Sequence, residues 1–206
     1  MSGQINRGSE LGEAIFEISR NEKYKNFLEI GTWNGQGSTK CFIDGLKLRS
    51  DNDWSFKSIE SNLNFFKMAV DFHKSDLEFY KGFDIIHGII SGEDDISETK
   101  FDLQSLKDQS LFKSQYEGFL KNDLDDYEHC LNLHLNEKFD VILLDGGEFT
   151  TYSEFLKLKD FCGMFILDDS NMLKNLKVVN CLLSDSEWDI ISQSNDRNGF
   201  CIFERV

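Results

Sequence analysis

The chain has 206 residues, enough for one domain with a hydrophobic core but too few for a second full domain. Apolar residues make up 40% and aromatic residues 13%, so the sequence predicts a folded globular protein. The net charge is −15, from 37 acidic and 22 basic residues, and the basic residues form no patch. Such a surface repels phosphate backbones and anionic lipids, so we expect neither a nucleic-acid partner nor a membrane partner.

The predicted elements alternate along the chain between amphipathic stretches and short apolar runs. Helical spacing of apolar residues predicts helices at 8–22, 37–48, 62–74, 151–161 and 171–184. Short apolar runs predict strands at 26–31, 55–60, 83–90, 139–145 and 163–168, and WDIISQS and GFCIFERV, joined by NDRN, predict a terminal antiparallel hairpin. This order is typical of an α/β fold: a single domain over 1–206 with a doubly wound, mainly parallel, seven-stranded sheet and helices on both faces.

The segment 93–136 is long for one crossover and rich in acidic residues. We expect one or two inserted helices there. They would serve as a substrate lid or as a contact in a homo-oligomer, and an enlarged solvated crossover is equally compatible with the composition.

Cysteine spacing and hydropathy indicate the cellular compartment in which the protein is expected. The five cysteines are odd in number and widely separated without a CxxC pair, which argues against a disulfide framework and a zinc site. The sequence has no apolar signal core near its start and no run of about 18 apolar residues. We therefore expect a cytoplasmic protein.

A glycine-rich loop follows the first predicted strand in NFLEIGTWNGQGSTKCF, residues 26–42. Such a loop lets the backbone approach a ligand closely, and the helix after it offers free N–H groups. A phosphate-binding P-loop is excluded because no lysine precedes Ser38. A dinucleotide fingerprint fits poorly because Trp33 stands where its second glycine belongs. A turn that only packs a helix against a strand remains the alternative.

The stretch Glu29-Ile30-Gly31-Thr32-Trp33-Asn34-Gly35 resembles the first motif of class I S-adenosylmethionine-dependent methyltransferases, which have a Rossmann-like fold. The resemblance implies S-adenosylmethionine (SAM) as cofactor. In that family the acid that ends the second strand holds both ribose hydroxyls, and Glu60 stands at that position, followed by Ser61. A carboxylate suits a vicinal diol because it accepts two hydrogen bonds at once. The resemblance therefore implies cofactor contacts by these residues: Glu29, Gly31, Thr32, Trp33, Gly35, Ser38, Glu60, Ser61, Ser91 and Asp145.

Three aspartates end two later strands, Asp145 in VILLDGG and Asp168 and Asp169 in MFILDDSN. Ligands of parallel sheets lie at this carboxyl edge. Three carboxylates brought together there repel one another unless a cation lies among them, and oxygen ligands favour Mg²⁺ or another hard divalent ion. The sequence therefore predicts a metal site, although any one aspartate could instead cap a helix.

The same region resembles the metal-dependent O-methyltransferases, and in particular a subgroup that methylates antibiotic sugars, with the pattern D-G-x-H-x-x-Y followed by L-D-D. Asp145, Gly146 and Tyr152 match in order, with Tyr152 one position late, but Glu148 replaces the histidine. The resemblance makes Glu148 the candidate general base beside Asp145, because a carboxylate can accept the proton of an acidified hydroxyl. Altered chemistry, extra metal ligation and lost activity remain open.

The implied function is transfer of the SAM methyl group to a hydroxyl of a small polar acceptor such as a sugar, assisted by a divalent ion. The alternatives are a metal-independent methyltransferase acting on nitrogen or oxygen, and a module that keeps the fold without catalysis. A nicotinamide-dependent oxidoreductase is disfavoured by the spacing of the glycine loop.

Overall fold

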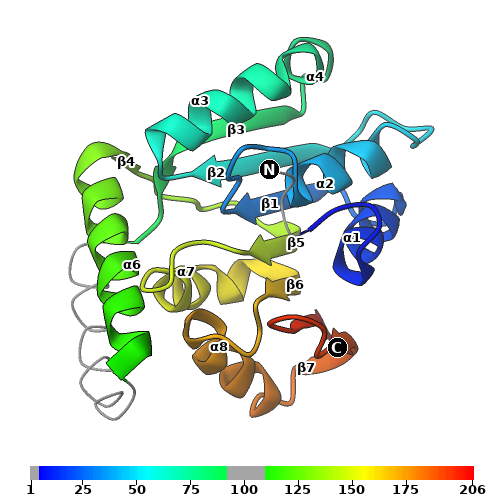
Figure 1. The fold of residues 1–206 in the computed structure, drawn as a ribbon. Helices are drawn as coiled ribbons and strands as arrows, with labels where there is room; N and C mark the ends of the chain where they lie inside the picture. Colours follow the sequence, from blue (N-terminus) through cyan, green and yellow to red (C-terminus); the bar gives the residue numbers. More distant parts are fainter. Residues whose placement is uncertain (1–4, 92–109) are drawn as a thin grey trace.

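The computed structural model describes residues 5–91 and 110–206, which form one eight-stranded sheet in the order β4-β3-β2-β1-β5-β6-β8-β7 (Figure 1). The strands are β1 Asn26–Ile30, β2 Ser55–Glu60, β3 Phe83–Ile89, β4 Leu131–Asn132, β5 Phe139–Leu144, β6 Cys162–Asp168, β7 Trp188–Ser194 and β8 Phe200–Arg205. Among the strands of the described residues, only the β6–β8 and β8–β7 pairs are antiparallel. The predicted fold class is confirmed, with one strand more than the seven expected, because the two residues of β4 pair with the end of β3.

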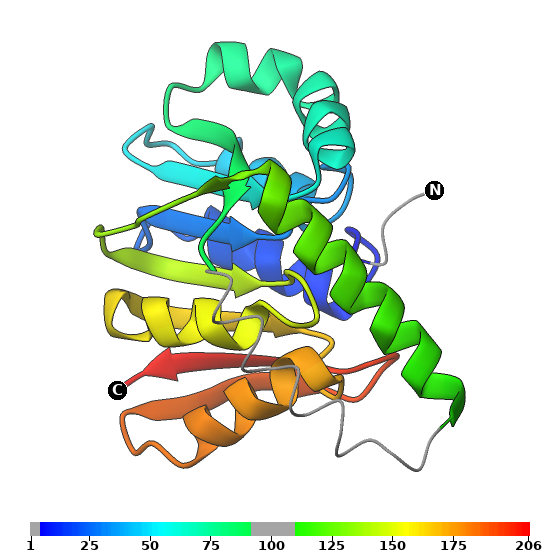
Figure 2. The ribbon, with the colours of Figure 1, turned by 90° about the vertical axis from the view of Figure 1, so that its left-hand side faces the viewer.

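The helices cover both faces of the sheet (Figures 1 and 2). Their bounds are α1 Glu10–Arg20, α2 Ser38–Leu46, α3 Leu63–Phe72, α4 Lys74–Phe79, α6 Ser110–His129, α7 Thr151–Leu158 and α8 Leu173–Leu183, with a 3-10 turn at Lys159–Phe161. The helix predicted at 62–74 is α3, which ends at Phe72; its C-cap His73 still donates its backbone N–H to Ala69, and α4 starts at the next residue. Among the described residues, no helix is long and apolar enough to cross a membrane.

Two hydrophobic cores follow from the alternation of side chains along each strand. Phe27, Phe56 and Val141 point to the face covered by α1 and α2. Leu28 and Ile142 point to the opposite face, covered by α7 and α8. Successive residues of a strand face opposite sides, so the position of each residue in the strand decides which core it joins.

Helix α6 runs diagonally past the carboxyl ends of the central strands (Figure 2). It belongs to the segment 93–136, of which residues 93–109 lie outside the described part of the chain. Within the described part, α6 and the short strand β4 account for most of the segment. Tyr116 of α6 packs on Phe149, in the loop after β5, and this contact fixes the helix beside the strand ends.

Candidate functional site

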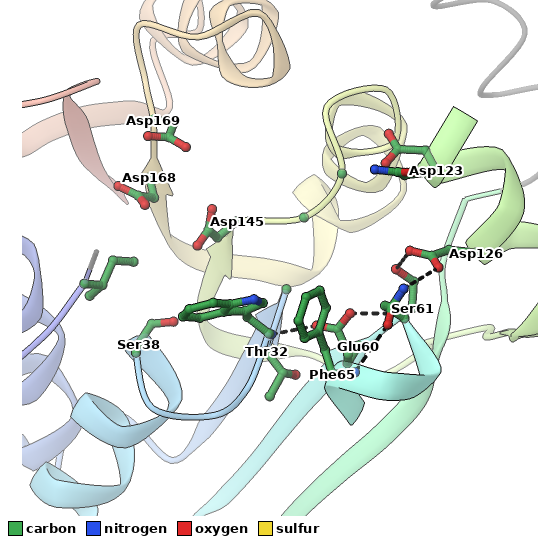
Figure 3. Close-up of a pocket in the computed structure, with 18 of the residues that line it drawn as sticks. Thr32, Ser38, Glu60, Ser61, Phe65, Asp123, Asp126, Asp145, Asp168 and Asp169 are labelled. Atoms are coloured by element: carbon green, nitrogen blue, oxygen red, sulfur yellow. Dashed lines mark hydrogen bonds between the residues drawn. The ribbon is translucent and has the colours of Figure 1, made fainter. Parts of the chain in front are cut away.

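A cavity of about 700 Å³ opens at the carboxyl edge of the sheet, where β1, β2, β5 and β6 end (Figure 3). Open α/β sheets bind their ligands at this edge. The lining residues come from the segment before α1, from the loops after these strands, from the starts of α2 and α3, and from α6: Ile5, Gly31, Thr32, Trp33, Gly37, Ser38, Glu60, Ser61, Asn62, Phe65, Asn122, Asp123, Asp125, Asp126, Asp145, Gly146, Gly147, Asp168 and Asp169. Most of the residues predicted from the sequence are therefore brought together.

The loop after β1 lines the cavity with Gly31, Thr32 and Trp33. Gly31 has a φ of 97°, and a Cβ at this residue would lie 2.2 Å from the backbone oxygen of Asp145. Only glycine fits such a contact. Gly35 also has a positive φ, but it packs against His73 and Ala69 of the α3 region and does not line the cavity. The two glycines thus have different roles: Gly31 brings two strand ends together, and Gly35 seats the loop on α3.

Glu60 is held at the cavity wall by backbone donors. Its carboxylate accepts from Trp33 N–H at 2.6 Å and from Asn62 N–H at 2.8 Å. Burial raises the pKa of Glu60 to about 7, and these two hydrogen bonds oppose the rise. Trp33 also places its ring edge-to-face with Phe65, with the ring centroids 6.0 Å apart. Glu60 is therefore oriented by the loop that carries Gly31, next to an aromatic pair.

Helix α6 adds acidic residues that the sequence analysis did not assign to the site. Asp126 accepts from Ser61 Oγ at 3.2 Å and from Asn62 Nδ2 at 3.0 Å (Figure 3). Asp123 accepts from Phe149 N–H at 2.8 Å. Burial raises the pKa of Asp123 to about 7. The helix thus bridges the loops after β2 and β5, a contact that no local pattern could have shown.

Besides Gly35, two residues predicted to bind the cofactor lie outside the cavity, Glu29 and Ser91. Glu29 is fully buried on the α2 face of β1, where Oε2 accepts from Thr39 Oγ1 at 2.7 Å and from Ser58 Oγ. Burial raises its pKa to about 7. Ser91 is fully buried and hydrogen-bonded to Thr150 and Ser153. In this structure both residues join elements of the fold instead of lining the cavity.

Asp145, Asp168 and Asp169, called here the aspartate cluster, gather at one side of the cavity, away from Glu60 (Figure 3). One carboxylate oxygen of each lies within 4.8 Å of the others. Burial, with the neighbouring Asp145 and Asp169 carboxylates, raises the pKa of Asp168 to about 7. The strand ends therefore meet as the sequence predicted.

Lys174 was not predicted, and it reaches the aspartate cluster from the start of α8. Its Nζ lies 2.6 Å from Asp145 Oδ1 and 3.2 Å from Asp169 Oδ2. Burial alone would lower the pKa of Lys174, but these two carboxylates raise it above its ordinary value. A lysine in the first turn of a helix lies near the positive end of the helix dipole, where its charge is unfavourable. In the sequence, this position was the one indication that Lys174 pairs with acidic groups.

Glu148, the candidate general base, does not line the cavity. Its Oε1 accepts from the backbone N–H of Lys174 at 3.0 Å, so it satisfies one of the free donors at the start of α8. Burial raises the pKa of Glu148. Its observed contact is that of a helix cap.

The donor set of the aspartate cluster suits a hard divalent ion, but its arrangement does not. The ammonium group of Lys174 already lies on two of the three carboxylates. A divalent ion bound there would have to displace this ammonium and leave it beside a second positive charge. The residues as arranged do not fit a resident metal ion, and magnesium stays a prediction from the sequence.

Comparison with known proteins places the fold. The sequence matches no protein-family model and no curated protein. Among solved structures, an O-methyltransferase from Bacillus cereus in complex with S-adenosylhomocysteine (SAH) matches at a TM-score of 0.62 and 13% identity, over 99% of this chain and 84% of that one. A methyltransferase from Geobacter sulfurreducens matches at a TM-score of 0.60 and 9% identity, over 98% and 82%. An SAH-bound methyltransferase from Podospora anserina matches at 0.55 and 14%, over 95% and 77%. The chain therefore has the fold of these methyltransferases, as the sequence resemblance implied.

Proposed function

We propose that the protein is a SAM-dependent methyltransferase that acts on a hydroxyl of a small polar acceptor. The main observation in support of this proposal is the position of Glu60 in the cavity. Its carboxylate accepts from the backbone N–H of Trp33, in the same loop as Gly31. Two of the solved structures that share the fold are described as SAH-bound, which supports the cofactor class.

The cofactor lies, in this proposal, along the loops after β1 and β2. Gly31 allows close approach of the backbone, and the carboxylate of Glu60 accepts hydrogen bonds from the two ribose hydroxyls. The faces of Trp33 and Phe65 offer a surface for the adenine ring or for the sulfonium cation. A cavity of about 700 Å³ lies within the range of sites for ligands of this size.

The acceptor lies at the aspartate cluster, across the cavity from Glu60. Its hydroxyl oxygen attacks the methyl carbon in line with the sulfur, so that the carbon–oxygen bond forms as the carbon–sulfur bond breaks and the electron pair stays on sulfur. A carboxylate at the cavity wall, Asp145 or Asp168, takes the hydroxyl proton. The remaining contribution of the protein is to hold the two reactants in line.

The test is calorimetric titration of SAM and SAH into wild type and Glu60→Ala. We expect micromolar binding to wild type and its loss in Glu60→Ala. Asp189→Ala, which removes a carboxylate exposed on β7, is the matched control and should bind as wild type does. Absence of heat with either ligand in wild type would refute the proposed function. Once binding is established, methyl transfer to a panel of sugars and other small hydroxyl compounds identifies the acceptor class.

A further inference from the structure

Lys174 holds its ammonium group inside the aspartate cluster. Its side chain is 7% exposed, and Nζ makes two ion pairs, with Asp145 at 2.6 Å and with Asp169 at 3.2 Å. A buried ammonium is stable only when it is paired, and these carboxylates supply the pairs. The contacts join the ends of β5 and β6 to the first turn of α8.

The surrounding hydrogen bonds fix Lys174 in this position. Glu148 accepts from its backbone N–H at 3.0 Å, and Asn175, the next residue, donates from its side chain to the backbone oxygen of Asp168. Asp169 has a φ of 53°, and its Oδ1 accepts from Asn198 Nδ2 at 2.9 Å. The start of α8 is therefore tied to both strand ends, and this places Nζ of Lys174 where it makes its two ion pairs.

Charge balance explains what the lysine does. Aspartates from neighbouring strand ends repel one another without a cation. Lys174 supplies a positive charge at the place where a divalent ion would bind the same carboxylates, and both cannot be present without strong repulsion. Lys174 itself does not line the cavity, so it acts on a ligand only through the aspartates that do.

We propose that Lys174 is the resident cation of the aspartate cluster, and that the protein orients its acceptor with Asp145 and Asp169 without a divalent metal ion. The second part rests on the proposed function. Lys174 is then a positioning residue: it fixes two carboxylates, and these make the contacts with the acceptor. Methyl transfer should accordingly proceed in the presence of a chelator.

Titration of Mn²⁺, followed by electron paramagnetic resonance, tests the first part without SAM. We expect wild type and Asp168→Asn to bind Mn²⁺ equally weakly, because the cluster offers the ion no place. In Lys174→Met the affinity should rise by about tenfold or more, since a like charge is removed from the ligands, and the gain should vanish in the double variant Lys174→Met/Asp168→Asn. Lys174→Arg keeps the charge and should resemble wild type.

A tight Mn²⁺ site in wild type that Asp168→Asn removes would overturn the proposal, and this comparison does not depend on the folding of any Lys174 variant. Methyl transfer that stops when a chelator is added and returns when Mg²⁺ is added would also overturn the proposal. The Mn²⁺ results are separable from the SAM titrations. Expected Mn²⁺ behaviour without SAM binding supports the resident cation and refutes only the methyltransferase. SAM binding together with a tight Mn²⁺ site in wild type supports the methyltransferase and refutes the resident cation.

Discussion

The two ends of the cavity are built in different ways. At the Glu60 end, the carboxylate at the end of β2 accepts from the backbone N–H of Trp33, in the loop after β1, and from that of Asn62, two residues further along its own loop. At the aspartate cluster, side chains from β5, β6 and α8 meet as ion pairs. The first end depends on backbone geometry, and the second depends on charge balance. Mutations should therefore affect the two ends by different mechanisms.

The largest effect is expected from Gly31→Ala, which disrupts the backbone geometry at the Glu60 end of the cavity. The substitution places a Cβ 2.2 Å from the backbone oxygen of Asp145, at a φ of 97°. Backbone strain alone costs about 1–3 kcal/mol in such conformations, and the overlap adds to it. We expect loss of SAM binding and a lower free energy of unfolding in urea.

Gly118→Ala is the matched control for that substitution. A Cβ at Gly118, in α6, meets no atom of the described residues within 4 Å. Alanine in a helix interior is favoured over glycine by about 0.5–1 kcal/mol, so the variant should be at least as stable as wild type. Equal stability of the two variants would contradict the role given to Gly31.

Glu29→Gln tests whether the buried carboxyl group near the end of β1 contributes to the stability of the fold. Burial raises the pKa of folded Glu29 from 4.5 to about 7, so its carboxyl favours the folded state when protonated. This stability is complete below pH 4.5 and is lost as the pH rises to 7. Relative to Glu29→Gln, the free energy of unfolding of wild type should fall by roughly 3 kcal/mol over this interval. Parallel pH profiles of the two proteins would show that Glu29 does not titrate there.

The Glu60 end should respond to pH in its affinity for SAM. Burial raises the pKa of Glu60 to about 7, and only the ionised carboxylate accepts hydrogen bonds with both oxygens from the ribose hydroxyls. The affinity for SAM should therefore rise by about tenfold between pH 6 and pH 8. Calorimetry of Glu60→Gln should give weaker binding with no such rise. A rise that persists in Glu60→Gln would assign the titration to another group.

The smallest effect is expected from Asp126→Asn. The charge of Asp126 contributes to the raised pKa of Glu60. The amide keeps one acceptor oxygen, for Ser61 or for Asn62, so one of the two contacts that hold α6 remains while the pKa of Glu60 falls. The pH profile of SAM binding should then move to lower pH with little change in affinity at pH 8. Loss of binding at pH 8 would mean instead that α6 is held in place by the charge.

Much of this arrangement followed from local patterns. The alternation of apolar runs and amphipathic stretches predicted the helices other than α4, and all strands except β4, whose two residues carry no periodicity. Strand ends were predictable because a parallel sheet collects them at one edge, so Glu60 and the aspartate cluster were expected to face a common site. Glu29 lies outside the cavity because its position in β1 turns its side chain to the α2 face, and its role in cofactor binding stays a prediction.

The sequence by itself determined which residues end the strands, which loop needs glycine and how the sheet is wound, because these depend on periodicity and on the backbone. Only the tertiary structure decided which charged residues of the helices meet the strand ends and the loops that follow them. Lys174 lies 29 residues from Asp145 along the chain, and Asp126 lies 65 residues from Ser61. Such pairs form when helices dock on a sheet, and their electrostatics depends on burial that no local pattern contains.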